Sequence, residues 1–549
     1  MCSASSSLSN GGTWRAPSFS GLFFDDFACD SVWLREQARL QLPPCPGVTG
    51  LLLHGEFRPH PDARRLETAA PVLECRVNHV SVATLADLKP GLFTIAIPLS
   101  ESSALGGPAV TLHLGGTSLT NLLAWLGRVT GLGPLQPYRR QNKNRQIRIA
   151  RLTTADGETI FDFAVRLCPY SMAFARRHAQ FAFNLVGFLT ADLGVGESAR
   201  CMARAADAAG VATALVPLKL NCKNRLGDQT YAARLQDENP HRVNVIHIDA
   251  PASRDIDHHH GKNFRAGKYN IAYWAWELTE FPDAWVPNFA YYDEVWSPSD
   301  FARNAIAMKS PLPVLTMPHA IAFPRPTGDA RAHFHLPPDK FLFLFIYDLN
   351  SYSARKNPQA VLEAFRLASL SADGSANSAA LVIKVQNAED NPSDFAALQA
   401  AVRDLPGTIL IAGTLRRHEI YELESACDCF VSLHRSEGFG LAVAECMYLG
   451  KPVISTDWSA TAEFVNARNG CPVRYTLATI EKNHGPYVKG QMWAEPDVAH
   501  AAEWMRRLFA DRALASGIGA AARATIEEKF SPAAIGARYR RRLESIATF

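Results

Sequence analysis

The sequence predicts an α/β protein preceded by a β-rich region, and three observations support this fold class. After about residue 180, short apolar runs alternate with stretches of helical periodicity, which is typical of parallel strands covered by helices. The Pro-rich and polar segment 322–339, "AFPRPTGDARAHFHLPPD", divides this part into two series. Residues 21–177 consist mainly of short apolar runs between turn residues, which favours antiparallel strands.

These observations predict five segments. Residues 1–20 are rich in Ser and Gly and are expected to form a disordered tail. The β-rich segment, 21–177, is expected to fold as an accessory domain of the sandwich or jelly-roll type. Two Rossmann-like domains follow at 181–322 and 336–526, and 527–549 is expected to form a C-terminal helix.

Composition narrows the class of partner and the compartment. The 549 residues are 47% hydrophobic, enough for several packed cores, and the formal net charge is only +3. So weak a charge argues against nucleic acid as a partner. The eleven cysteines show no repeated pair spacing, and neither a signal peptide nor a membrane-spanning apolar run is evident. We therefore expect a cytoplasmic protein, with peripheral contact at the inner face of the cytoplasmic membrane left open. The oligomeric state has no signal in the sequence.

The two series of strands indicate where a ligand would bind. The first series reads "FNLVGFL", "ATALVPL" and "VNVIHIDA", and the second contains "FLFLFIYDL", "ALVIKV" and "CFVSLH". Each series predicts a parallel sheet, and ligands bind such sheets in the crevice beyond the carboxyl ends of the strands. Two facing sheets of this kind would enclose a ligand cleft, so the loops that follow strands are the candidate functional segments.

Two glutamates follow the strand "CFVSLH" in the segment "RSEGFGLAVAECMYLG". Glu437 precedes a predicted helix N-terminus, where free backbone N–H groups and the macrodipole favour anions. Glu445 lies within that helix among apolar residues, where an unpaired carboxylate is costly. Its partner is either a nearby base such as Lys451 or the hydroxyl groups of a ligand. The eight helical steps from Glu437 to Glu445 correspond to roughly 12 Å, too far for the acid and nucleophile of a hydrolase.

The loop after the first strand of the second series contains "ARKNPQAVLEAF". Pro358 suits the first turn of a helix and Asn357 the position before it, which places Arg355 and Lys356 at a helix N-terminus. Two cations beside free backbone N–H groups form an anion site suited to a phosphate, although an ordinary basic surface loop would have the same composition. This loop ends at the same edge of the sheet as "RSEGFG", so the two loops are expected to share one ligand.

The segments "RSEGFGLAVAECMYLGKPVIST", "ARKNPQAVLEAF" and "NLVGFLTADLGVGESAR" together resemble glycosyltransferase family 4, the retaining, nucleotide-sugar-dependent transferases with the GT-B fold. The resemblance covers about residues 181–549. It implies that Arg355 and Lys356 hold the donor diphosphate and that Glu445 receives the ribose hydroxyls. It also implies that the last helix crosses back onto the first Rossmann-like domain. The residues implied to contact the transferred sugar are Glu437 and the backbone of Gly438, Phe439, Gly440 and Leu441.

The sequence departs from this family in two places. Many relatives have a sugar-contacting histidine after the strand that corresponds to "VNVIHIDAP", and that position is either His247 or Asp249 here. Relatives commonly have two adjacent glycines in the first loop, whereas this chain has Gly194 and Gly196 around a valine. The spacing still permits close backbone approach to a phosphate or acceptor, and a simple turn at the start of the helix is the alternative.

The predicted function is that of a retaining, hexosyltransferase-type glycosyltransferase. It would move a sugar from a nucleotide-diphosphate sugar to a carbohydrate or lipid-linked acceptor in bacterial surface polysaccharide or glycoconjugate synthesis. The alternatives are a nonenzymatic nucleotide-sugar binder and another GT-B enzyme, an epimerase or a phosphorylase. No cofactor is expected, since the nucleotide sugar is a co-substrate. No metal is expected either, because the consecutive histidines of "DIDHHHG" at 255–261 cannot all converge on one ion.

Overall fold

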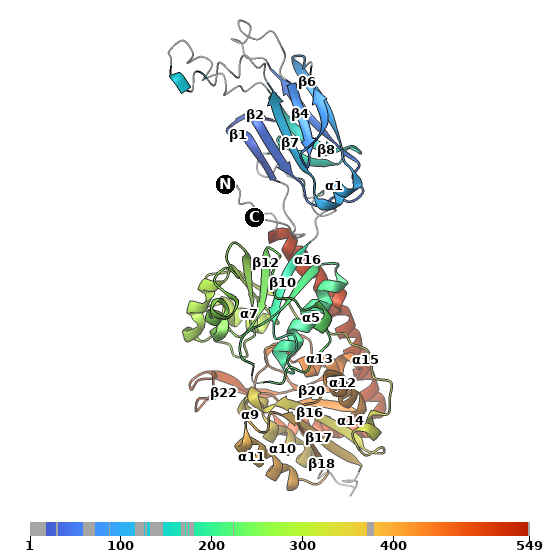
Figure 1. Cartoon of the computed structure of the whole chain (residues 1–549). Coiled ribbons are helices and arrows are strands. Elements are labelled where there is room, and N and C mark those ends of the chain that lie inside the picture. The colour runs from blue at the N-terminus through green and yellow to red at the C-terminus, as the bar shows by residue number, and fades with distance from the viewer. Residues whose placement is uncertain are drawn as a thin grey trace. The chain divides into compact units, whose positions relative to one another are not determined.

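The structure is a computed structural model of the chain (Figure 1). Its described residues are 18–28, 31–58, 72–86, 88–115, 126, 129–131, 147–165, 171, 174, 181–222, 224–369 and 378–546. The chain divides into two compact units, Met1–Phe181 with Glu544–Phe549, and Ala182–Leu543. Across the described ranges, no helix has the length and apolar character that a bilayer crossing would need.

The first unit is built on one antiparallel sheet of nine strands. The strand order is β5-β4-β7-β2-β8-β3-β6, with β1 beside β2 and β9 beside β8. One short helix, α1 (Glu101–Gly106), accompanies the sheet. The strands are β1 (Ser18–Ala28), β2 (Ser31–Gln41), β3 (Gly50–Phe57), β4 (Val72–Val77), β5 (Val80–Leu85), β6 (Gly91–Pro98), β7 (Ala109–Gly115), β8 (Ile147–Thr154) and β9 (Thr159–Asp162).

The strands of this unit form one continuous hydrogen-bonded sheet, and its predicted sandwich or jelly-roll type stays a prediction. Strand β2 pairs with β7 through residues 37–41 and with β8 through residues 32–33, and this link joins all the strands into one sheet. Alternate residues of β3 and β4 are buried, and Leu34, Leu53 and Leu112 belong to one common core. Of the predicted tail, residues 1–17 lie outside the described residues, whereas 18–20 already belong to β1.

The second unit begins with a parallel sheet of six strands in the order β11-β10-β12-β13-β14-β15. All residues of β12 and β14 are buried, including the polar Asn244 and Glu294, as expected for a parallel sheet that is covered on both faces. The strands are β10 (Ala182–Gly187), β11 (Ala212–Pro217), β12 (Val243–His247), β13 (Tyr269–Tyr273), β14 (Glu294–Ser297) and β15 (Val314–Thr316). The helices include α5 (Gly194–Ala208), α6 (Ile256–His260) and α7 (Asp300–Ala307).

A second parallel sheet of six strands follows, in the order β18-β17-β16-β19-β20-β21. Its strands are β16 (Phe341–Asp348), β17 (Ala379–Gln386), β18 (Thr408–Ala412), β19 (Cys429–Ser432), β20 (Val453–Thr456) and β21 (Cys471–Val473). A hairpin of β22 (Tyr475–Thr479) and β23 (Met492–Pro496) is inserted after β21. The helices are α8 (Ala330–His333), α9 (Ser353–Lys356), α10 (Pro358–Ser369), α11 (Pro392–Arg403), α12 (Arg417–Ala426), α13 (Leu441–Tyr448), α14 (Val498–Ala510) and α15 (Arg512–Lys529).

The two parallel sheets confirm the prediction of an α/β chain with two Rossmann-like domains, and their topology fixes where ligands bind. In an open parallel sheet the ligand crevice forms where the strand order reverses. That point lies between β10 and β12 in the first sheet and between β16 and β19 in the second. The loops after β16 and β19 contain Arg355, Lys356 and Glu437, so the predicted phosphate and sugar loops open at one switch point.

The last helix, α16 (Pro532–Ile546), returns from the second Rossmann-like domain to the first (Figure 1). The ring of Tyr539 stacks on Trp296 of β14 with 5.5 Å between centroids. Arg542 Nε donates to Glu294 Oε1 at 2.9 Å. Gly536 faces α5 so closely that a Cβ atom would lie 2.1 Å from the carbonyl oxygen of Ala205. The helix therefore ties the two domains together by close packing and a buried ion pair.

Replacing Gly536 with Ala is expected to weaken this tie. The added methyl group would overlap backbone of α5, and overpacking of this kind costs about 1–3 kcal/mol. We expect the midpoint of thermal unfolding to fall relative to the wild type. Gly517→Ala is the matched control, since nothing lies within 4 Å of a Cβ atom at this position in α15. An alanine there should be neutral or slightly stabilising. Equal midpoints for both variants would contradict the close packing of α16.

Candidate active site

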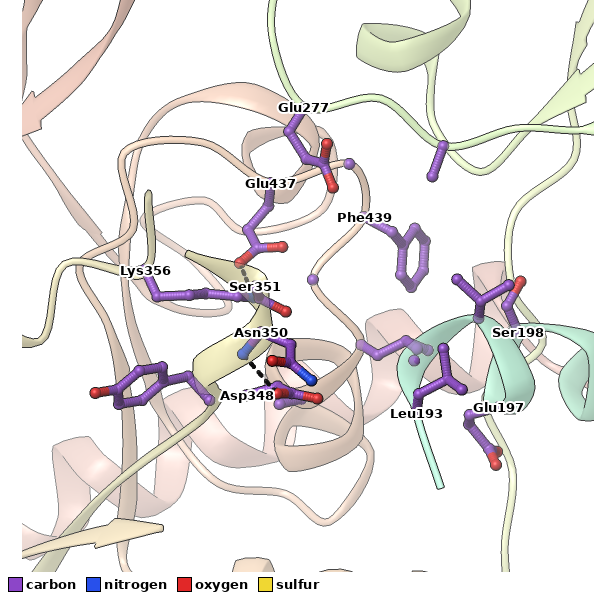
Figure 2. Close-up of a pocket in the computed structure, with 18 of the residues that line it drawn as sticks. Leu193, Glu197, Ser198, Glu277, Asp348, Asn350, Ser351, Lys356, Glu437 and Phe439 are labelled. Atoms are coloured by element: carbon purple, nitrogen blue, oxygen red, sulfur yellow. Dashed lines mark hydrogen bonds and ion pairs between the residues drawn. The ribbon is translucent and has the colours of Figure 1, made fainter. Parts of the chain in front are cut away.

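A cavity of about 760 Å³ opens between the two Rossmann-like domains at the ends of the strands. The first domain contributes the start of α5 and the loops after β12 and β13, and the second contributes α9, the "RSEGFG" loop and α13. Figure 2 shows Lys356 directed toward Glu437, with Glu277 nearby and Leu193, Glu197 and Ser198 on the α5 side. Segments far apart in sequence thus line one cavity.

Arg355 and Lys356 converge on Glu437 from the neighbouring loop. Arg355 Nη1 donates to the carbonyl oxygen of Ser436 at 3.0 Å and lies 3.2 Å from Glu437 Oε2. Lys356 Nζ donates to Glu437 Oε1. All three side chains line the cavity, and Arg355 is only 4% exposed. Buried ion pairs therefore join the two loops that the sequence predicted to share a ligand.

Charge compensation keeps this cluster ionised. Burial acts to raise the pKa of Glu437, but the ammonium of Lys356 and the guanidinium of Arg355 outweigh it and lower the pKa to about 2. Burial lowers the pKa of Lys356 from its ordinary value, and Glu437 opposes that effect. A second carboxylate, Glu277 of the first domain, lies 4.0 Å from Arg355 Nη2, so the two cations face two carboxylates across the cavity. Both cations line the cavity, where they can also meet an anionic ligand group.

The "RSEGFG" loop shows why its glycines are needed. Gly440 precedes α13 with a φ of +94°, a left-handed conformation that side chains rarely adopt. A Cβ atom there would also lie 2.6 Å from Cγ2 of Thr461. Phe439 is buried, with its ring 4.6 Å from His319 and 5.7 Å from Phe530. The cavity lining includes the whole run of Gly438, Phe439, Gly440 and Leu441, so this loop follows the cavity wall.

Glu445 lies in α13 and is 2% exposed, as its apolar surroundings predicted. Its partner is Arg417, whose Nη2 donates to Glu445 Oε1. Lys451, the base suggested from sequence, instead donates to the carbonyl oxygen of Ser425 at 2.7 Å. Glu445 also lines the cavity, so an ion pair with Arg417 and an accessible ligand face occur together.

The two glycines of the first loop have different surroundings. Gly194 begins α5 and lines the cavity, and a Cβ atom at this position would have no neighbour within 4 Å. At Gly196, a Cβ atom would lie 2.5 Å from the carbonyl oxygen of Ala191 and 2.8 Å from that of Phe188. Gly196 is absent from the cavity lining, so the tight turn at the start of the helix, and not the predicted donor contact, explains why this position is glycine.

The structure also separates the two candidates on the first domain. Asp249 lines the cavity, and its side chain is exposed to that space. Burial and the nearby carboxylate of Glu277 raise the pKa of Asp249 to about 6. His247 is fully buried behind the wall, stacked on Tyr273 at 4.1 Å with Nδ1 3.3 Å from Ser198 Oγ. His247 is therefore placed to pack the core, and Asp249 to meet a ligand.

Several cavity residues were not predicted from the sequence. His319 follows β15, and its Nδ1 lies 3.1 Å from the hydroxyl of Tyr273. Tyr487 reaches the cavity from the β22–β23 hairpin, with its ring 5.7 Å from the guanidinium of Arg355. His319 could have been predicted, because it follows the last strand of the first sheet and ligands bind beyond the carboxyl ends of parallel strands. Tyr487 has no such signal, because its hairpin is an insertion that no strand periodicity places near the cleft.

The histidine-rich segment 255–261 does not form a metal site in the described structure. His258, His259 and His260 end the short helix α6, and His260 Nε2 accepts from the backbone N–H of Lys219 at 3.0 Å. Across the described ranges, no group of three or more His, Cys, Asp and Glu side chains is arranged to hold an ion.

Comparison with known proteins finds a similarity to one family within the second domain. Residues 329–524 match the family model described as "Glycosyl transferases group 1". The matched segment contains Arg355, Lys356, Glu437 and Glu445, and it supports the predicted enzyme class of glycosyltransferase. No curated protein matches this chain.

Solved structures that are similar to this chain include the following three. HepE of Anabaena in complex with UDP and glucose is 13% identical, with 66% of this chain and 100% of that chain covered at a TM-score of 0.49. Sucrose-phosphate synthase from Thermosynechococcus elongatus is 14% identical, with 67% of this chain and 99% of that chain covered at a TM-score of 0.48. A glycosyltransferase from Rickettsia africae is 13% identical, with 67% of this chain and 98% of that chain covered at a TM-score of 0.47. The fold assignment rests on the two parallel sheets themselves.

One buried carboxyl group at the cavity, that of Glu424, accepts no hydrogen bond from the described residues. Glu424 of α12 is 1% exposed, and neither of its carboxylate oxygens has a hydrogen-bond partner in the described structure. Burial raises the pKa of Glu424 to about 8, with Glu197 acting in the same direction and Arg417 opposing both. The group is therefore expected to keep its proton at neutral pH.

This proton should make stability depend on pH. Between the ordinary pKa of 4.5 and about 8, the folded protein holds a proton on Glu424 that the unfolded chain has lost. The free energy of unfolding should therefore fall with rising pH across this window, by at most about 1.4 kcal/mol per pH unit from this group. Glu424→Gln should remove that contribution, as measured by chemical unfolding at several pH values.

Glu528→Gln, an exposed change in α15, is the control for this measurement and should keep the wild-type slope. If Glu424→Gln also kept the wild-type slope, Glu424 would be ionised in the folded protein and would need a partner that the structure does not show.

Proposed function

We propose that this chain is a retaining glycosyltransferase that moves a hexosyl group from a nucleotide-diphosphate sugar to a carbohydrate or lipid-linked acceptor. The observation that carries the proposal is the convergence of Arg355 and Lys356 with Glu437 at the switch point of the second sheet, with Glu445 two turns further along. Cations for a diphosphate, a carboxylate for a sugar and a carboxylate for a ribose all lie along one cavity wall. A nucleotide sugar has a diphosphate, a sugar and a ribose, and each of them would meet one of these protein groups.

In the proposed reaction the bond between the sugar C1 and the diphosphate oxygen breaks, and negative charge grows on the diphosphate. Arg355, Lys356 and the backbone N–H groups at the start of α13 stabilise that charge. The acceptor hydroxyl then forms a bond to C1 from the face that the nucleotide leaves, so the configuration is retained. Its proton passes to the departing phosphate oxygen, and no separate protein base is required.

The first domain supplies the opposite wall of the cavity. Asp249 and Glu277 are carboxylates that can accept hydrogen bonds from sugar hydroxyls. The raised pKa of Asp249, about 6, means that it is mostly ionised at neutral pH and therefore mostly an acceptor. We assign to Asp249 the sugar-contacting position that the resemblance left open between two residues.

The decisive experiment begins with thermal-shift measurements on the full chain with UDP, GDP, ADP and their sugars, since a ligand that binds the folded state raises its midpoint. The donor that gives the largest shift is then incubated with the protein, and release of the nucleoside diphosphate is measured. A shift without release or transfer to any acceptor would indicate a nonenzymatic binder. No shift with any nucleotide would contradict the proposal as a whole.

Replacing Lys356 with Ala tests the role of the cations. Removing one preorganised charge from the leaving group should lower turnover of that donor by about 10²-fold or more, with a smaller effect on its KM. Lys529→Ala, at the exposed end of α15, is the control and should keep wild-type turnover. Turnover unchanged in Lys356→Ala would remove the diphosphate-binding role from this residue.

Replacing Glu445 with Gln tests the ribose contact. Loss of a charged acceptor should weaken nucleotide binding about tenfold, because hydrogen bonds to charged groups contribute about 1.5–3 kcal/mol. Isothermal titration calorimetry with the nucleoside diphosphate measures this change. Glu503→Gln, on the exposed face of α14, should bind as the wild type does. Wild-type affinity in Glu445→Gln would show that its function is confined to pairing with Arg417.

A further inference from the structure

Arg417 occupies the boundary between the two Rossmann-like domains. It is the first residue of α12 and lines the cavity. Its Nη2 contacts Oε1 of Glu445 in the same domain. Its Nε lies 3.5 Å from Oε2 of Glu197, which belongs to α5 of the opposite domain. One guanidinium thus bridges two buried carboxylates that come from different domains.

Glu197 is firmly held on its own side. Arg200 Nε lies 2.9 Å from its Oε2, and Arg204 Nη2 lies 2.6 Å from its Oε1. Burial acts to raise the pKa of Glu197, but Arg417, Arg204 and Arg200 together hold it well below its ordinary value. Glu197 is therefore a fixed negative charge against which Arg417 can be anchored.

Tyr421 reinforces the same contact. Arg417 Nε donates to the hydroxyl of Tyr421 at 3.0 Å, and that hydroxyl donates to Glu197 Oε1 at 3.4 Å. The guanidinium also lies 4.6 Å from the centroid of the Tyr421 ring. These contacts fix the plane of the guanidinium, and the Nη2 edge is left to meet Glu445. A lysine at this position would place a single charged point there and could not bridge both carboxylates.

The bridge leaves part of Glu445 available. Arg417 contacts Oε1, and no polar partner of Oε2 lies among the residues that the structure describes. A carboxylate offers about four acceptor positions, so Glu445 can keep its ion pair and still accept from ligand hydroxyls. The direction in which it accepts is then set by Arg417.

We propose that Arg417 is a positioning residue for the donor nucleotide, which orients Glu445 by anchoring it to Glu197 of the opposite domain. This inference rests on the proposed function, because Glu445 is taken to bind the ribose. Its consequence is specific. Glu197 belongs to the domain that does not hold the nucleotide, yet nucleotide affinity depends on it, because Glu197 acts through Arg417.

A double-mutant cycle tests the dependence. UDP, GDP or ADP, whichever binds the wild type most tightly, is titrated calorimetrically into the wild type, Arg417→Gln, Glu197→Gln and the double variant. Each single change should weaken binding about tenfold, as loss of one charged contact does. If Glu197 acts through Arg417, the double variant should also lose about tenfold, well short of the product of the two single effects.

Asp228 provides the control cycle. It lies 3.3 Å from Arg200 Nε and so perturbs the same cluster, but no contact joins it to Arg417 in the described part of the chain. Asp228→Asn combined with Arg417→Gln should give the product of the two single effects on nucleotide affinity.

Arg417→Lys adds a second readout. It keeps the positive charge and should restore the melting temperature toward that of the wild type while leaving nucleotide binding weakened.

The possible outcomes are distinct. Multiplicative effects of Arg417→Gln and Glu197→Gln, or wild-type affinity in Arg417→Gln, would overturn the inference and leave the proposed function intact. A wild type that binds none of the three nucleotides would overturn both. If a variant of the cycle fails to fold, Tyr421→Phe replaces it, since this change removes only the hydroxyl that bridges Arg417 and Glu197. It should weaken binding about threefold, and unchanged affinity would again overturn the inference.

Discussion

The ion pairs of Glu437 with Arg355 and Lys356 are the interaction on which the rest of the site depends. They join the loop after β16 to the loop after β19 at the point where the strand order of the second sheet reverses. A backbone hydrogen bond from the N–H of Arg435 to the carbonyl oxygen of Arg355, at 2.8 Å, joins the same two loops, so it sets their spacing together with the buried charges. With that spacing fixed, α13 begins at the cavity wall, and Glu445 lies two turns further along the same wall.

The cleft balances its buried charges across the domain boundary. Glu437 is compensated by two cations of its own domain, whereas Glu445 and Glu197 share Arg417 from opposite sides. Buried ion pairs contribute little net stability after desolvation, but breaking one leaves a costly uncompensated charge. Such pairs define geometry more than they strengthen the fold. The proposed transferase would hold a charged donor between two domains, and this fixed geometry suits that function.

Much of the architecture could be predicted because it depends on local patterns. Uninterrupted apolar runs predicted buried parallel strands, and the residues after them predicted Arg355, Lys356 and Glu437 as site residues. Local patterns failed where a long-range contact decides. Short apolar runs between turn residues predicted the strands of the first unit, but the pairing of β2 with both β7 and β8, which makes one sheet, depends on segments far apart in sequence.

The amino-acid sequence alone was enough for the fold class, the strand-end loops and the kinds of side chain they present, because strand burial and helix termini leave signals within a few residues. Which groups meet became known only from the packed chain. Glu445 pairs with Arg417 instead of Lys451, Asp249 faces the cavity while His247 packs in the core, and Tyr487 comes in from an inserted hairpin. These contacts join segments that are far apart in the sequence, and no local pattern encodes the partner of a buried charge.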